Sequence, residues 1–173
     1  AQPVIDLADA RVLRGVLAGV PLDAAQLNAV AHALSEKDTP AVAALTRAAP
    51  EEARRALQAL PGLYGGDEVL DTARRVLPSR PLVRQALDEL QWLATHLRQA
   101  HPGLRTGFDL SDMSGYAYYS GPRYAVYGAG CSDALARGGR YDEVGAVFGR
   151  NRPAVGFSLD LKTLAEVSAA APA

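Results

Sequence analysis

Residues 136–142 read Ala-Arg-Gly-Gly-Arg-Tyr-Asp, and residues 153–158 read Pro-Ala-Val-Gly-Phe-Ser. This pattern predicts a ligand-binding loop between two short strands. Paired glycines allow a backbone to approach a ligand closely and to adopt a positive φ angle without a Cβ penalty. Arg140 adds a planar fork of hydrogen-bond donors, and Tyr141 adds an aromatic face that carries a hydroxyl. We therefore expect a binding site at this loop.

Short runs of aromatic and β-branched residues surround the loop and predict the strands of a mostly antiparallel sheet. These runs, which glycines separate, cover residues 104–110, 116–127, 132–137 and 154–159, and a further strand is expected at residues 4–7. Most of the tyrosines lie between Tyr116 and Tyr141, where they can offer a pocket both apolar walls and hydroxyls. The alternative is cross-strand pairing of aromatic rings on an exposed face.

The region before these strands has a different character. Residues 6–101 are rich in alanine, leucine and arginine, and their apolar residues recur at helical spacing. We expect successive helices there, the longest over residues 81–100, with Asp23 and Thr39 as N-terminal caps. A final helix is expected to begin near Asp160.

The helical region contains few candidate catalytic groups. His32, His96 and His101 stand apart from one another and from carboxylates at metal-binding spacing, so we expect solvated or capping roles for them and no metal site. Trp92 is expected to pack against neighbouring helices. This region therefore has the composition of a scaffold.

The change of character predicts a division of the chain. We expect a sheet domain formed by residues 1–20 and 102–173, with residues 21–101 as a helical insertion. The chain starts without methionine and leads directly into a strand, so we interpret it as a fragment that lacks an N-terminal portion.

The composition limits the possible partners. With 173 residues and a formal net charge of −1, the chain has no basic excess to attract a polyanion, so we expect no nucleic-acid partner. Cys131 is the one cysteine, which excludes an internal disulfide and a cysteine cluster for zinc. No apolar run approaches the roughly 20 residues of a membrane span. We expect a cytoplasmic protein with no membrane association.

Gly-Gly-Arg-Tyr-Asp followed by Pro-Ala-Val-Gly-Phe closely resembles the histidyl-tRNA synthetase family, and the resemblance is dense over residues 108–164. It implies an α+β fold with an antiparallel sheet of the class II aminoacyl-tRNA synthetase type, flanked by helices. It also implies a pocket shaped for histidine. By this resemblance the pocket residues are Tyr118, Tyr119, Gly138, Gly139, Arg140 and Tyr141.

The chain departs from active synthetases of this family at two positions. Their double-tyrosine motif begins with an arginine, whereas residues 114–121 read Ser-Gly-Tyr-Ala-Tyr-Tyr-Ser-Gly and place Ser114 there. Their last helix carries an arginine that contacts ATP, and Thr163 stands in its place, with Asp160 where they have glycine. Fixed cations stabilise the negative charge that develops during amino-acid activation, so their loss argues against synthetase activity.

The segment Asp109-Leu110-Ser111 and the pair Phe148-Gly149 resemble a catalytically inactive branch of the family, the regulatory subunits of ATP phosphoribosyltransferase. This resemblance implies a regulatory subunit without catalytic activity or cofactor, which a short-form catalytic subunit requires in the first step of histidine biosynthesis. The implied partners are that catalytic subunit, a second copy in a dimer, and histidine as feedback inhibitor.

Three alternatives stay open at this point. The chain could be a catalytic-domain fragment of an active histidyl-tRNA synthetase. It could also be a synthetase-like domain used only for assembly, with an empty pocket. Arg140 could have a purely structural role by pairing with Asp142 or with a backbone carbonyl.

Overall fold

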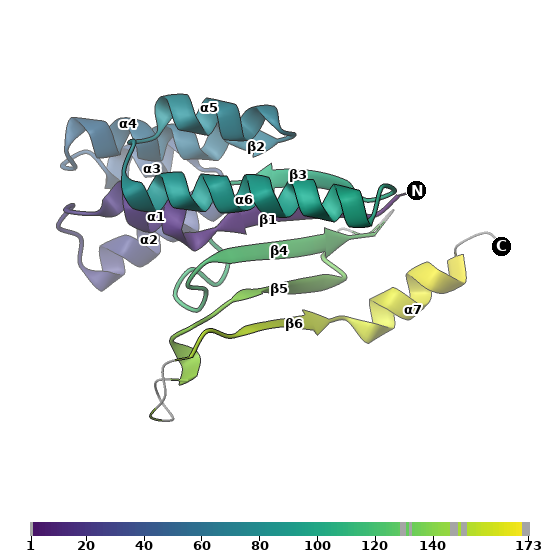
Figure 1. Ribbon diagram of the computed structural model, residues 1–173. Coiled ribbons are helices and arrows are strands. Elements are labelled where there is room, and N and C mark those ends of the chain that lie inside the picture. Colours follow the sequence, from purple (N-terminus) through teal and green to yellow (C-terminus); the bar gives the residue numbers. More distant parts are fainter. Residues whose placement is uncertain (1, 129–130, 132, 146–148, 150–151, 171–173) are drawn as a thin grey trace.

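The computed structural model describes residues 2–128, 131, 133–145, 149 and 152–170. Its centre is a six-stranded sheet with the order β2-β3-β1-β4-β5-β6, in which β1 and β3 are parallel and the other neighbours are antiparallel (Figure 1). The strands are β1 (Val4–Asp9), β2 (Tyr64–Gly65), β3 (Arg105–Asp109), β4 (Pro122–Tyr127), β5 (Ala136–Arg140) and β6 (Val155–Leu159). The predicted α+β class with a mostly antiparallel sheet is confirmed.

The helices form a layer above one part of this sheet (Figure 1). They are α1 (Ala10–Leu17), α2 (Ala24–Ser35), α3 (Thr39–Leu45), α4 (Glu51–Ala59), α5 (Glu68–Val76) and α6 (Pro81–Ala100), with a 3-10 turn η1 (Leu60–Gly62). The last helix, α7 (Leu161–Ala170), follows β6 and lies apart from this layer (Figure 1). Asp23 caps α2 as predicted, in a reciprocal capping box with Gln26. The predicted cap Thr39 is wrong, because the Asp38 carboxylate accepts the Ala41 N–H at 2.9 Å and Thr39 is already helical.

The core lies between α6 and the strands β1, β3 and β4. Apolar side chains from α1, α2, α4, α6 and the sheet form one continuous cluster, whose largest fully buried members include Leu13, Leu34, Leu57, Leu90 and Phe108. Residues of the predicted helical insertion and residues of the sheet therefore belong to the same hydrophobic core. The domain boundaries at residues 21 and 101 stay a prediction.

A buried ion cluster ties the sheet to α6. Arg11 donates to the fully buried carboxylate of Asp9 at 2.5 Å and to Glu89 on α6 at 2.7 Å. Burial works against the charge of Arg11, but the hydrogen bonds to Asp9 and Glu89 outweigh it and raise the pKa of this guanidinium. The hydrogen bond from Arg11 correspondingly lowers the pKa of Glu89.

Two predicted strands have different limits in the structure. Residues 116–121 form a turn, and β4 begins only at Pro122. The strand predicted at residues 132–137 begins at Ala136 and continues to Arg140, so the paired glycines lie within β5 and not in a loop. Ser132 and Phe148 lie outside the described residues.

The half of the sheet formed by β5 and β6 has no helix above it, and α7 extends away from the sheet (Figure 1). The prediction for Trp92 is wrong, because 58% of this residue is exposed. Its ring packs on His96 of the next helical turn, with 3.9 Å between ring centroids.

Candidate binding site on the polar face of the sheet

Two glycines form a flat floor on the sheet face opposite α6. Gly139 of β5 and Gly156 of β6 are direct register partners. A Cβ atom on Gly139 would lie 2.8 Å from Cδ1 of Tyr119, and one on Gly156 would overlap the Tyr141 hydroxyl. The glycines are therefore required because tyrosine rings rest on the strands. The paired glycines of the sequence motif, Gly138 and Gly139, do not have positive φ angles, so that part of the prediction is wrong.

Three tyrosines gather over this floor. The ring centroid of Tyr118 lies 4.8 Å from that of Tyr141 and 5.4 Å from that of Tyr119, the second pair in edge-to-face geometry. Tyr119 and Tyr141 are half-buried, whereas 48% of Tyr118 is exposed. Desolvation and the neighbouring tyrosines raise the pKa of Tyr118. Like any tyrosine hydroxyl, it is protonated at neutral pH and can donate a hydrogen bond. We call Tyr118, Tyr119 and Tyr141 the tyrosine cluster.

The remaining two predicted pocket residues belong to the other face of the sheet. Side chains alternate along a strand, so Gly138 and Arg140 face α6 when Gly139 and Tyr141 face the cluster. A Cβ on Gly138 would lie 2.8 Å from Cζ of Tyr124, which packs against the core. Arg140 Nε donates to both carboxylate oxygens of Asp142 at 2.9 and 3.0 Å, the pairing that the structural alternative predicts.

Two arginines hold the turn that carries the double tyrosine. Arg14 of α1 donates to the carbonyl oxygens of Tyr116 and Tyr119 at 3.1 and 2.8 Å. Arg123 of β4 is only 6% exposed, donates to the carbonyl oxygen of Ser114, and forms an ion pair with Asp112. These contacts explain why this tyrosine-rich segment is a turn and not a strand.

The turn is also fastened to the end of β5. Ser120 N–H donates to the Arg140 carbonyl at 2.9 Å, and the Ser120 hydroxyl accepts from Asp142 N–H at 2.9 Å. Gly115 has φ +71° and lies against the Tyr119 ring, so a side chain there would be both strained and obstructed. The tyrosine cluster is thus fixed from two sides before any ligand binds.

Acidic residues extend the same face toward the centre of the sheet. Burial raises the pKa of Asp6 on β1, and the nearby carboxylates of Asp109 and Asp112 add to this effect. Lys37 partly offsets it while donating to Asp109 at 2.7 Å. Next to the tyrosine cluster, this face therefore offers carboxylates and the paired ammonium group of Lys37.

The sequence pattern did not identify Arg14, Arg123 or Asp6 as parts of this region. For Arg123 a signal existed, because it alternates with Tyr124 and Val126, which face the core. Arg14 comes from a helix far away in sequence, and no pattern indicated it.

The two departures from active synthetases do not meet in space. The Ser114 hydroxyl donates to Asp112 at 2.6 Å beside the start of β4. Thr163 lies beyond the far end of β6, where its N–H donates to Asp160 at 3.0 Å. β6, which has five residues and spans roughly 16 Å, runs between these two ends of the sheet. Hydrogen bonds from the start of α7 lower the pKa of Asp160, which acts as its cap.

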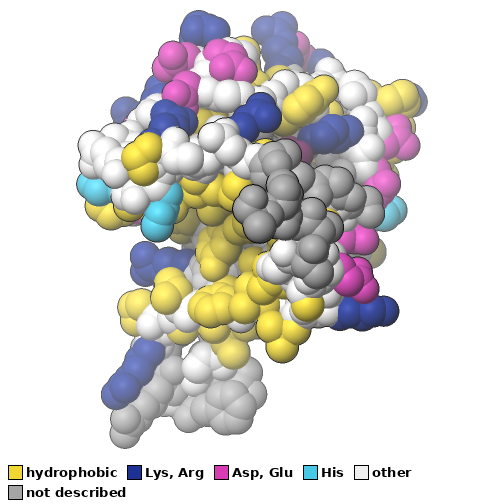
Figure 2. All heavy atoms as spheres, turned by 90° about the vertical axis from the view of Figure 1, so that its right-hand side faces the viewer, with side chains coloured by type: hydrophobic (Ala, Val, Ile, Leu, Met, Phe, Trp, Pro, Cys, Tyr) yellow, Lys and Arg dark blue, Asp and Glu magenta, His cyan; other side chains and the backbone are white. Residues whose placement is uncertain are grey.

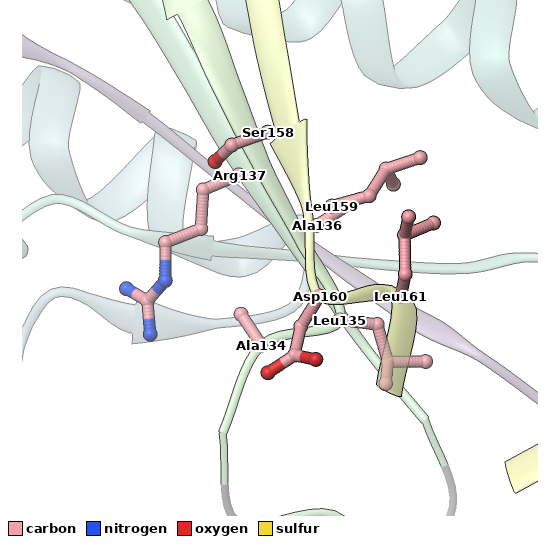
Figure 3. A pocket seen from close by; sticks show the side chains of 8 residues that line it. All are labelled: Ala134, Leu135, Ala136, Arg137, Ser158, Leu159, Asp160 and Leu161. Carbon is pink, nitrogen blue, oxygen red and sulfur yellow. The ribbon is translucent and has the colours of Figure 1, made fainter. Parts of the chain in front are cut away.

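Two hollows lie beside β6. The smaller, about 480 Å³, lies where β6 meets α7, with Arg137 and Ser158 on one side and Leu159 and Leu161 on the other (Figure 3). The larger, about 780 Å³, is an apolar cleft between α6 and strands β4 to β6. Figure 2 shows hydrophobic side chains gathered in a hollow below the helical layer.

Among the described residues, no three histidine, cysteine, aspartate or glutamate side chains are grouped so that they could hold a metal ion. None of the helices in the described part of the chain has the length and hydropathy needed to cross a membrane.

Comparisons with known proteins identify a family model, curated relatives and solved structures that are similar to this chain. The family model described as histidyl-tRNA synthetase matches residues 1–164. A curated "ATP phosphoribosyltransferase regulatory subunit" from Albidiferax ferrireducens is 50% identical over 172 residues, which cover 99% of this chain and 44% of that protein. The chain thus spans less than half the length of this relative.

Two solved structures have a similar fold. An "ATP phosphoribosyltransferase regulatory subunit/histidyl-tRNA synthetase" from Bacillus halodurans aligns with a TM-score of 0.80 and 23% identity, covering 96% of this chain and 44% of that one. An "ATP phosphoribosyl transferase (HisG:HisZ) complex" from Thermotoga maritima gives a TM-score of 0.68 at 17% identity, covering 92% and 53%.

Proposed function

Because the chain belongs to the histidyl-tRNA synthetase family, we propose that it forms part of a regulatory subunit of ATP phosphoribosyltransferase. The observation that carries this proposal is the 50% identity to a curated regulatory subunit across nearly the whole chain. In the proposed role the subunit activates a short-form catalytic subunit and takes part in feedback inhibition by histidine. This role places it in the cytoplasm, as a dimer within a hetero-oligomer.

The proposed subunit has no catalytic activity of its own. The guanidinium that contacts Ser114 belongs to Arg123, and its ion pair with Asp112 leaves it poorly suited to stabilise a developing phosphate charge. At the other position, Thr163 follows the anionic cap Asp160, whose negative charge opposes the binding of a polyanion. Both features support the proposal that this protein does not bind and activate a nucleotide as active synthetases do.

Histidine is the proposed ligand of the tyrosine cluster. The rings of Tyr118, Tyr119 and Tyr141 give an imidazole flat apolar surfaces, and their hydroxyls give it hydrogen-bond partners. The acidic side chains near Asp6 offer complementary charge to an ammonium group. A ligand that binds two assembly states with affinities differing by about 1–3 kcal/mol is sufficient for regulation.

The test uses the full-length protein mixed with the short-form catalytic subunit from the same source. Formation of phosphoribosyl-ATP from ATP and phosphoribosyl pyrophosphate is measured with and without histidine. We expect activity only in the mixture, and we expect histidine to reduce it. Histidine-dependent ATP–pyrophosphate exchange by the full-length protein alone, without any effect on the catalytic subunit, would instead identify an active synthetase.

A second candidate function, assembly with an empty pocket, is favoured by the internal pairing of Arg140 with Asp142. Tyr118→Ala separates the two, because Tyr118 is half exposed and its removal opens the cluster without touching the core. If histidine regulates by binding at the cluster, Tyr118→Ala should raise the histidine concentration needed for inhibition at least tenfold. This corresponds to a loss of about 1.4 kcal/mol of binding free energy. Tyr64→Ala, at another exposed tyrosine on β2, serves as the control. An unchanged histidine response in both variants would support the empty pocket.

A further inference from the structure

Two backbone carbonyls of the turn that carries the double tyrosine receive hydrogen bonds from one side chain. The Nη2 atom of Arg14 on α1 donates to the carbonyl oxygens of Tyr116 and Tyr119, at 3.1 and 2.8 Å. Within the turn, the N–H groups of Tyr118 and Tyr119 both donate to the Gly115 carbonyl. Among the described residues, Arg14 is therefore the donor that satisfies these two oxygens, which the backbone of the turn leaves unpaired.

The charge of Arg14 is also directed at this turn. Among the described residues it has no carboxylate partner, unlike Arg11 and Arg123, which form ion pairs. Its guanidinium carbon lies 5.1 Å from the ring centroid of Tyr116, which is a cation–π distance. Burial raises the pKa of Tyr116, and the nearby charge of Arg14 works against this rise. The polar contacts that the structure describes for this side chain are thus all made with the turn.

Helix α1 gives this side chain a rigid support. Its fully buried apolar side chains are Val12, Leu13 and Val16. A Cβ atom on Gly15 would lie 2.6 Å from Cγ2 of Val83, so α1 and α6 are in close contact beside Arg14. The end of α1 is held as well, because Arg80 donates to the carbonyl oxygens of Gly15 and Ala18 at 2.9 and 2.7 Å. Because α1 is fixed in this way, Arg14 determines where the carbonyls of the turn lie.

The same turn carries two members of the tyrosine cluster. Tyr119 is one of the residues whose carbonyl Arg14 holds, and its ring rests on Gly139. Tyr118 precedes it, and the rings of these two tyrosines meet edge to face. Tyr141, the third member, follows β5 and does not belong to the turn. The geometry of the cluster therefore depends on how the turn is held relative to the sheet.

We propose that Arg14 is a positioning residue of the binding site, which orders the double-tyrosine turn before histidine binds and thereby sets the affinity for histidine. This inference rests on the proposed function, because it takes the tyrosine cluster as the histidine site. Without this arginine, the ligand itself must order the turn. The apparent dissociation constant then rises in proportion to the loss of ordered molecules.

Arg14→Met in the full-length protein removes the donors and keeps an unbranched side chain. In the free variant we expect the amides of Tyr118 and Tyr119 to exchange faster by about tenfold or more, because their hydrogen bonds to Gly115 open more often. We expect the dissociation constant for histidine, measured by calorimetry, to rise by about fivefold or more. Saturating histidine should restore the slow exchange, because the bound ligand orders the turn.

Two further variants separate this role from a general loss of stability. Arg14→Lys is the conservative variant, because one ammonium nitrogen can donate to both carbonyls as Nη2 does. It should recover most of the affinity and most of the protection, and it provides the comparison if Arg14→Met does not fold. Arg84→Met, at an exposed arginine on α6, is the matched control and should leave both measurements within about twofold.

Other results would overturn the proposal. One is an unchanged affinity and unchanged exchange in Arg14→Met. Another is faster exchange throughout α1 and α6 that histidine does not reverse, because this would show a general structural role. If the unsubstituted protein binds no histidine, the proposed ligand fails and the effect on affinity fails with it. Exchange of the turn amides in the free variants would then still confirm or exclude the ordering by Arg14.

Discussion

The glycines beneath the tyrosine cluster show how a single missing methyl group can shape a site. Gly139 lies where a Cβ would meet the Pro122 carbonyl at 2.7 Å and the Arg123 Cα at 2.9 Å. Both neighbours are backbone atoms of the adjacent strand, so they cannot move aside as a flexible side chain can. The packing of β4 against β5 therefore adds to the requirement for glycine that the Tyr119 ring imposes.

We expect Gly139→Ala to destabilise the protein by about 2 kcal/mol, because the methyl group forces β4 and β5 apart. Urea unfolding of the variant measures this change. Gly103→Ala is the matched control, since a Cβ at Gly103 meets no atom within 4 Å. Equal stability of the two variants would contradict the steric explanation.

At this scale the sequence indicated which residue types gather but not how they are oriented. The Gly-Gly-Arg-Tyr motif pointed to the correct part of the sheet, yet Arg140 faces α6 and pairs with Asp142. The motif did not reveal the strand register, and register determines the face on which each side chain lies. Arg14 was missed because it reaches the turn from α1, more than 100 residues away in sequence.

Contacts between elements depend on a few charged residues. Glu89 is the one contribution of α6 to the ion cluster with Asp9 and Arg11. Its pKa is lowered in the folded protein, mainly by the hydrogen bond from Arg11. The resulting stability is present above the unfolded pKa, near 4.5, and is lost as the pH falls through the lower folded value.

We therefore expect Glu89→Gln to reduce stability at pH 7 by about 0.5 kcal/mol, a modest value because the side chain is partly exposed. The difference from the unsubstituted protein should disappear as the pH falls well below 4.5. Chemical unfolding at a series of pH values measures this. Asp88→Asn, at the neighbouring and more exposed position of α6, is the control. A difference that stays constant with pH would rule out the ionic explanation.

The helices were largely predictable, and five of the six strands were predicted, some with other bounds, whereas the two-residue β2 was missed. Helical periodicity and caps such as Asp23 are local signals, so they can be read without tertiary contacts. β5 extends through two glycines, which strand propensity disfavours, because the rings above them fill the space. The turn at Tyr118 has strand-like composition, but hydrogen bonds from Arg14 and Arg123 hold it in another shape.

Over the whole molecule, one half of the sheet is covered and the other half is exposed. The class II synthetase type of fold was predictable from motifs, whereas the exposure of Trp92 was not. Helical spacing places an apolar residue on a face but does not say what covers that face. Trp92 lines a cleft whose other wall is β6.

This asymmetry predicts that the 173-residue chain alone self-associates through the β6 edge. Sedimentation velocity should show a concentration-dependent increase in size, which Phe157→Lys should reduce, because a lysine on the edge opposes strand pairing. Val76→Lys, at an exposed valine on α5, is the control. Equal association of both variants would locate the contact elsewhere.

The position of β1 has a consequence for the order in which the protein folds. β1 precedes the helices α1 to α6 in sequence, yet Val4 lies between Arg105 of β3 on one side and Tyr127 of β4 on the other. During synthesis it cannot acquire either neighbour until the whole helical layer has left the ribosome. Closing so large a loop is entropically unfavourable, and such non-local pairing slows folding. The helices α1 to α6 are therefore expected to assemble first, and β1, although it is made before them, is expected to be completed among the last.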